Sequence, residues 1–301
     1  LYGRMRVDAA IQASLEPQGD YINTTFLPTL AGGEARIVDV ELDEALGVMY
    51  VLGRNRAGRE EPPERALRPW IALVRYELDA IEDAAPMHGL GYYNPPAGVT
   101  YSTMALGEEH VYVGASYDYA RAQNSFPYAQ GSYILVYERE LTLPESSVPG
   151  VPEDRDILYV LPVDLGQGNA LAQQVLDIEV RDALMFVSIQ GQGVAIYSIQ
   201  DPRRPSLVRH VKQALDAQGV TRDLPSADLL GVHRGSLYVS QGEQVYALDV
   251  RQPQAPQQAM FEARDYFGAH ALLPEQGVVA SASSSGLDLT ELDPPAQPAP
   301  L

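Results

Sequence analysis

Apolar residues occur along this chain in short alternating runs that are separated by turn residues, which is the pattern of antiparallel β-strands. One order of elements recurs five times: an apolar strand, a short polar turn, a second apolar strand, and a third strand that ends in acidic or polar residues. The first strands of the five units are expected at 37–42, 100–106, 175–180, 227–232 and 270–273. Because a small sheet of this kind cannot bury its own faces, such units must stack on one another.

The unit that begins at residue 175 has the most regular pattern. Its strands are expected at 175–180, 184–189, 194–199 and 207–211, and they carry branched or aromatic residues. The glycines of Gly191-Gln192-Gly193 supply the positive φ of a tight hairpin turn. Four antiparallel strands per unit, with no helical stretch, predict an all-β fold: a β-propeller of four-stranded antiparallel blades with five units visible. The pattern leaves open whether these units form a closed five-bladed ring or part of a larger one.

In two units the third strand leads to the fourth through a polar turn that contains two prolines. The stretches are AIYSIQDPRRPSLVRHV (195–211) and VYALDVRQPQAPQQAMF (245–261), and residues 287–298 match them in part. In these residues the chain resembles the LVIVD-type repeats of bacterial β-propellers, over about a third of its length. The resemblance implies a propeller scaffold and no defined activity.

The 301 residues and the 46% hydrophobic content allow a substantial core. Continuous repeats predict one propeller domain over residues 1–293, in which residues 1–9 supply a closing outer strand for the last unit. Residues 294–301 are expected to form a Pro-rich tail or linker. The chain starts at Leu1 and shows no signal-peptide pattern, so we expect it to be part of a longer multidomain chain.

A net charge of −19 and the absence of cysteine exclude several classes of site and partner. The charge repels nucleic acid and anionic membranes, and there is no apolar run long enough for a membrane span, so we expect neither a nucleic-acid partner nor membrane insertion. Disulfides, thiolate zinc sites and thiol nucleophiles are excluded. An acidic surface suits an extracellular, periplasmic or cell-envelope protein of bacteria.

No cofactor is predicted, but the many carboxylates leave open a divalent cation such as calcium. Asp39, Asp177 and Asp228 recur at or near the first strands of their units. They either form a ring that holds a cation or are a repeated feature of the blade template.

Turns between first and second strands are short, whereas residues accumulate elsewhere. The surplus lies at 53–69 and 115–132, between second and third strands, and at 79–99, 142–174 and 212–226, between units. Because each strand reverses direction, these connections are expected on one face of the propeller, which would carry function.

The connections are rich in tyrosine, tryptophan and arginine, which are frequent in interfaces because they give contact area at low entropic cost. The candidate binding residues are Arg68, Trp70, Tyr92, Tyr93, Tyr117, Tyr119, Arg121 and Tyr128. They form either a binding surface for a protein or a glycan, or the internal packing of the long loops.

Two histidines join these candidates. His270 opens a first strand and is expected to face the channel mouth, and His88 is expected in a loop on the same face. The other three histidines are expected to be solvated, and none of the five shows metal-type spacing. The serine run at 281–285 lacks the G-x-S-x-G context of a nucleophile.

The sequence contains no catalytic constellation, which favours a non-catalytic recognition or scaffold module of a larger bacterial envelope or extracellular protein. Its ligand would be a protein or a glycan, bound through the long-loop face. The alternative is a propeller enzyme, such as a lactonase-like hydrolase or a polysaccharide lyase, with its site at the channel mouth. A third interpretation is a structural spacer. Convergence of His270, His88 and the first-strand aspartates would favour the enzyme.

Overall fold

We describe the chain from a computed structural model. The described residues are 35–43, 48–55, 69–75, 88–93, 99–117, 131–139, 158–163, 165, 174–215, 220–241, 244–250, 258–262, 270–273, 276–283 and 286–292. The chain divides into two compact units, Leu1–Asp164 and Leu165–Leu301, and each is described by itself.

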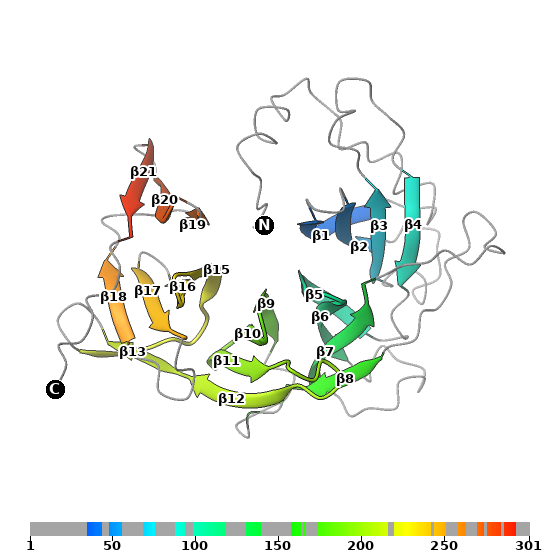
Figure 1. The fold of residues 1–301 in the computed structure, drawn as a ribbon, viewed down its shortest axis with the longest axis horizontal. Coiled ribbons are helices and arrows are strands. Elements are labelled where there is room, and N and C mark those ends of the chain that lie inside the picture. The colour runs from blue at the N-terminus through cyan, green and yellow to red at the C-terminus, as the bar shows by residue number, and fades with distance from the viewer. Residues whose placement is uncertain are drawn as a thin grey trace. The chain divides into compact units, whose positions relative to one another are not determined.

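The first unit contains two four-stranded antiparallel sheets, each with its strands in sequence order (Figure 1). Blade 1 comprises β1 (Ala35–Asp43), β2 (Val48–Asn55), β3 (Pro69–Arg75) and β4 (His88–Tyr93). Blade 2 comprises β5 (Val99–Leu106), β6 (His110–Tyr117), β7 (Gly131–Glu138) and β8 (Tyr159–Pro162).

The second unit contains three further blades and a small additional hairpin. Blade 3 comprises β9 (Val175–Arg181), β10 (Leu184–Ile189), β11 (Gly193–Ser198) and β12 (Ser206–Val211). The hairpin comprises β13 (Gln213–Leu215) and β14 (Thr221–Asp223). Blade 4 comprises β15 (Asp228–His233), β16 (Ser236–Gln241), β17 (Gln244–Asp249) and β18 (Gln258–Glu262). Blade 5 comprises β19 (His270–Leu273), β20 (Val278–Ser283) and β21 (Gly286–Glu291).

The fold is all-β, of the β-propeller class, with four-stranded antiparallel blades, as the sequence predicts. All five expected first strands are present, as β1, β5, β9, β15 and β19. Blade 5 has three strands within the described residues; its expected closing strand, 1–9, and the Pro-rich tail, 294–301, lie outside them. No helix of the described part is long and apolar enough to cross a membrane.

Neighbouring blades within each unit pack face to face. In the first unit Tyr50 and Leu52 of blade 1 share a buried cluster with Met104, Val113 and Leu135 of blade 2. In the second unit one cluster joins blades 3 and 4 and another joins blades 4 and 5. Because both faces of blade 4 are covered in this way, its strand β16 is buried over five consecutive residues.

The first strand of each four-stranded blade contains an irregularity of the β-bulge type. The extra residue is Val38 in β1, Ser102 in β5, Leu176 in β9 and Leu230 in β15. A bulge bends its strand and changes the direction of the neighbouring side chains. Asp39 and Asp177 each follow a bulged residue directly, which gives them the position described below.

The connections differ from expectation, because the sequence analysis missed three elements. The expected inter-unit connections 79–99, 142–174 and 212–226 contain β4, β8 and the β13–β14 hairpin, respectively. As a result, two long connections join a third strand to a fourth strand: residues 76–87 in blade 1 and residues 140–157 in blade 2. Such a connection starts at the same end of the blade as the turn between the first and second strands. The expectation that one face carries only short turns was therefore wrong. The long segments between second and third strands, 56–68 and 118–130, are where they were expected.

Candidate functional site

Four of the predicted aromatic binding residues occupy one kind of position in the first unit. Trp70 is the second residue of β3, Tyr92 and Tyr93 end β4, and Tyr117 ends β6. Tyr93 pairs with Ile71 in the strand ladder. All four therefore lie at the same end of their blades. This is the end that carries the connections between second and third strands and the connections between blades. We call these four residues the aromatic end. The other predicted binding residues of this surface, Arg68, Tyr119, Arg121 and Tyr128, lie outside the described residues.

Three placements in the predicted set need correction. Tyr92, Tyr93 and His88 were expected in a loop, but all three belong to β4. His88 opens this strand opposite Arg75, so it lies at the end of blade 1 remote from the aromatic end. The sequence signal was misleading here because Gly89 and Gly91 make His88–Tyr93 resemble a loop.

Asp39 joins blade 1 to blade 2. Its Oδ2 accepts hydrogen bonds from the Thr103 hydroxyl and from the Met104 backbone N–H, both at 2.9 Å. Its Oδ1 accepts a hydrogen bond from the Val40 N–H. Hydrogen bonds to an ionised acceptor are stronger than neutral ones, so this carboxylate stabilises the contact between β1 and β5.

Asp177 plays the same part between blades 3 and 4. Its Oδ2 accepts a hydrogen bond from the Leu229 N–H at 3.0 Å, and the neighbouring Ser188 hydroxyl donates to the Ala227 carbonyl. Asp228, in contrast, is exposed. Asp39 and Asp177 thus act as a repeated connection between blades, which supports the template interpretation of these residues.

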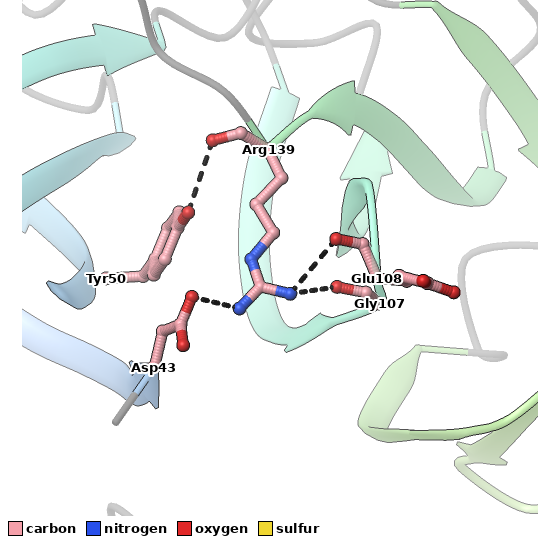
Figure 2. Close-up of polar contacts among 5 residues, drawn as sticks. All are labelled: Asp43, Tyr50, Gly107, Glu108 and Arg139. Carbon is pink, nitrogen blue, oxygen red and sulfur yellow. Dashed lines mark hydrogen bonds and ion pairs between the residues drawn. The ribbon is translucent and has the colours of Figure 1, made fainter. Parts of the chain in front are cut away.

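An arginine that the sequence analysis did not single out forms the most connected polar group of the first unit. Figure 2 shows the Arg139 side chain between the Asp43 carboxylate of blade 1 and the first hairpin turn of blade 2. Its Nη1 donates to the carbonyl oxygens of Gly107 and Glu108, at 2.5 and 3.2 Å. The Arg139 carbonyl accepts a hydrogen bond from the Tyr50 hydroxyl at 3.2 Å.

Burial makes this group structurally important. The side chain of Asp43 is 5% exposed and that of Arg139 is 18% exposed. Burial raises the pKa of Tyr50, and the hydrogen bond and charge of Arg139 oppose that shift. We call Arg139, Asp43 and Tyr50 the arginine clamp, because together they fix blade 1 against blade 2.

His270 is the predicted site residue that the structure describes best. It opens β19 at the blade end where the blade-to-blade connection arrives, as expected. Its ring is buried, and its Nδ1 lies 2.8 Å from the hydroxyl of Ser281 on β20, which is also buried. Ser281 is therefore inaccessible to a bulky substrate, and its evident role is to orient the imidazole.

The remaining histidines differ from one another. His110 and His233 lie at hairpin turns, as expected. His210 lies in β12 and its Nε2 donates to the Gln192 carbonyl at 2.5 Å. Burial lowers the pKa of His210, so it is less solvated than expected. Among the described side chains, no three or more His, Asp or Glu groups are placed to hold a metal ion.

No protein-family model matches the chain, and no curated protein matches its sequence. Several solved propeller structures resemble it at low identity. The computationally designed Ika8 protein is 11% identical, with 86% of this chain and 59% of that one covered and a TM-score of 0.48. Hsv2 of Kluyveromyces lactis is 12% identical over 86% of this chain and 60% of that one, with a TM-score of 0.46. The periplasmic gluconolactonase PpgL of Pseudomonas aeruginosa is 12% identical over 85% and 81%, with a TM-score of 0.45.

The chain spans about three fifths of the length of the Ika8 and Hsv2 chains. Likeness at this level carries no functional argument. The order of strands within each blade is therefore what places this chain among the β-propellers.

Proposed function

We propose that this chain is a non-catalytic recognition module of a larger bacterial envelope or extracellular protein, which binds a protein or a glycan through the aromatic end of blades 1 and 2. The observation that carries the proposal is the common position of Trp70, Tyr92, Tyr93 and Tyr117. Binding residues carried by strands have their backbone positioned by the sheet, which lowers the cost of ordering them when a ligand binds.

The polar groups that lie between neighbouring blades support a scaffold rather than an enzyme. Asp39 and Asp177 hold neighbouring blades together, and Arg139 does the same. Catalysis needs such groups to be directed at a substrate. The enzyme alternative needs His88 to converge with His270 and the first-strand aspartates at the channel mouth. His88 lies at the end of its blade opposite to the aromatic end, which does not support this alternative.

Binding arrays test this proposal. The purified chain is applied to arrays of bacterial surface glycans and of envelope proteins, and each hit is measured by titration calorimetry. We expect Trp70→Ala and Tyr93→Ala each to weaken the binding at least tenfold, as alanine substitutions at aromatic hot spots do. Leu207→Ala is the matched control, because Leu207 is an exposed apolar residue of β12, in the other unit.

Equal binding by all three variants would refute the role of the aromatic end. Turnover of a sugar lactone or a polysaccharide by the purified chain would refute the non-catalytic assignment.

A further inference from the structure

The third strand of blade 5 has an outer edge without a neighbouring strand in the described part of the chain. Blades 3 and 4, in the same unit, each carry a fourth strand at this edge: β12 pairs with β11, and β18 pairs with β17. In blade 5 the described sheet ends at β21. An unpaired edge of this kind is a template for another extended segment.

A shared hydrogen bond gives the three blades of this unit a common numbering. The residue that follows the third strand donates its backbone N–H to the carbonyl of the residue that precedes the second strand. The donor–acceptor pairs are Ile199–Ala183, Val250–Gly235 and Leu292–Gly277, in blades 3, 4 and 5. We call each donor the reference residue of its blade, and positions counted from it are equivalent from blade to blade.

Leu289, in β21, differs from its equivalents in exposure. It is the third residue before the reference residue, and its equivalents are Ile196 and Ala247. These two side chains are 0% and 8% exposed, whereas that of Leu289 is 62% exposed. Both equivalents lie opposite a residue of the fourth strand, Arg209 and Ala259, respectively. Leu289 therefore occupies a position that is covered in the four-stranded blades of this unit.

The sequence after β21 repeats the turn that leads to the fourth strand in blades 3 and 4. In each of the three blades, prolines occupy the third and the sixth positions after the reference residue. They are Pro202 and Pro205, Pro253 and Pro256, and Pro295 and Pro298. The fourth strands of blades 3 and 4 begin at the seventh and the eighth positions, at Ser206 and Gln258. The same count predicts a strand that begins at 299 or 300 in blade 5.

The pairing in blades 3 and 4 also predicts which residues would meet. The eighth residue after the reference residue lies opposite the second residue before it. The pairs are Leu207–Tyr197 in blade 3 and Gln258–Leu248 in blade 4. The same register places Pro300 opposite Thr290, and its continuation in blade 4, Ala259 opposite Ala247, corresponds to Leu301 opposite Leu289. The segment would thus bring an apolar side chain beside the exposed one.

A proline at position 300 suits this register. Backbone N–H groups alternate between the two sides of a strand, and the reference residue directs its N–H towards the second strand. The residue two positions before it does the same, so its fourth-strand partner forms a non-hydrogen-bonded pair and directs its own N–H outwards. Proline lacks an N–H and is tolerated in an edge strand where that group would face outwards.

We propose that the outer edge of β21 binds residues 299–301 of this chain as the beginning of a fourth strand, which the chain reaches through a turn at 293–298. These residues lie outside the described part of the structure, and the sequence analysis expected them to form a Pro-rich tail or linker. One edge accepts one strand, so this contact takes the place expected for residues 1–9. The contact completes blade 5 and goes beyond the recognition function proposed above, on which it does not depend.

Disulfide formation tests the contact, because the chain has no cysteine of its own. Residues directly opposite each other on antiparallel strands have Cα atoms about 4.5–5.5 Å apart, a separation that a disulfide spans. After mild oxidation, Leu289→Cys/Leu301→Cys is expected to form an intramolecular disulfide in most molecules, as measured by mass spectrometry after alkylation. Leu289→Cys/Ala296→Cys is the matched control, because its second cysteine lies in the turn, and its yield should be severalfold lower.

Three results of this experiment would overturn the proposal. Equal yields in the two variants would show that the segment is not paired with β21. A disulfide between two molecules would show that a second copy of the chain occupies the edge. A higher yield for Met5→Cys/Leu289→Cys than for Leu289→Cys/Leu301→Cys would assign the edge to residues 1–9.

Hydrogen exchange gives a second measurement that needs no cysteine. By the alternation described above, the N–H of Leu289 faces the outer edge and that of Thr290 faces β20. Deletion of residues 299–301 is expected to speed exchange at Leu289 by about tenfold and to leave exchange at Thr290 unchanged. Far-UV circular dichroism checks that the shortened chain is folded. Unchanged exchange at Leu289 in the folded, shortened chain overturns the proposal.

Discussion

Replacing Arg139 by methionine tests the arginine clamp. Methionine keeps an unbranched side chain of similar reach but removes the guanidinium. The Arg139 backbone N–H donates to the carbonyl of Glu109, just before the second strand of its blade, and the residues that donate the corresponding hydrogen bond in blades 3, 4 and 5 are the apolar Ile199, Val250 and Leu292. The substitution therefore suits the local backbone. What it removes is the ion pair with Asp43 and the donors to two carbonyl groups of the first hairpin turn of blade 2.

The size of the effect follows from burial. Asp43 is almost fully buried and would lose its guanidinium partner. Removing one member of a buried ion pair costs about 3–5 kcal/mol. Because the Arg139 side chain retains 18% exposure, we expect a loss near the lower end, about 3 kcal/mol of unfolding free energy.

Urea unfolding followed by tryptophan fluorescence measures this loss. The chain has one tryptophan, Trp70, and it lies in blade 1, so the signal reports on the unit that contains the clamp. The double variant Arg139→Met/Asp43→Asn should be no less stable than Arg139→Met, since it no longer buries the Asp43 charge. A loss below about 1 kcal/mol for Arg139→Met would show that the pair behaves like a surface salt bridge, and the reasoning from burial would be wrong.

Three further predictions concern a tight turn and two pH ranges. Gly193→Ala should lower the unfolding free energy by about 1–3 kcal/mol more than Gly191→Ala does. A Cβ at Gly193 would meet the carbonyl oxygens of Val211 and Leu224, whereas nothing lies within 4 Å of a Cβ at Gly191. Thermal unfolding measures the difference, and equal losses for the two variants would contradict this reasoning. Burial lowers the pKa of His210, so the unfolded chain binds a proton at this imidazole more readily than the folded chain does. The contribution of neutral His210 to stability is therefore full above about pH 6.5 and declines as the pH falls below that value. His210→Gln should flatten the pH dependence of the melting temperature below about pH 6.5. Burial raises the pKa of Tyr112 and of Tyr197 to about 12, so the stability that these two phenols contribute is lost as the pH rises from about 10 towards 12. The absorbance of tyrosinate from these residues should appear together with unfolding. Its appearance while the chain is still folded would contradict the raised pKa values.

The strands of this fold were predictable because their apolar residues are dense and their turns are short. The expected strand 184–189 matches β10, and 270–273 matches β19. Fourth strands were harder to recognise, because they lie at the outer edge of a blade and need fewer apolar residues. For this reason we interpreted two fourth strands as connections. They are β4, which has glycines at 89 and 91, and β8, which has only four residues.

The candidate site was predictable only in part. Residue type indicated the aromatic end and His270, but contacts between blades depend on spatial neighbours that are distant in sequence, such as Asp39 and Met104. Arg139 was missed although a comparison among the repeats would have detected it, since a charged residue stands there in place of an apolar one.

The aspartate contacts have a direction along the chain. In both described cases the carboxylate belongs to the earlier blade and the backbone donor to the later one. A shortened chain that lacks its later blades would therefore keep a carboxylate without its donor, whereas one that lacks its earlier blades would keep only a backbone N–H. During synthesis each blade would emerge before the donor that it needs, so successive blades would become stable in order from the amino terminus. Removal of whole blades from the two ends of the array should for this reason have unequal effects.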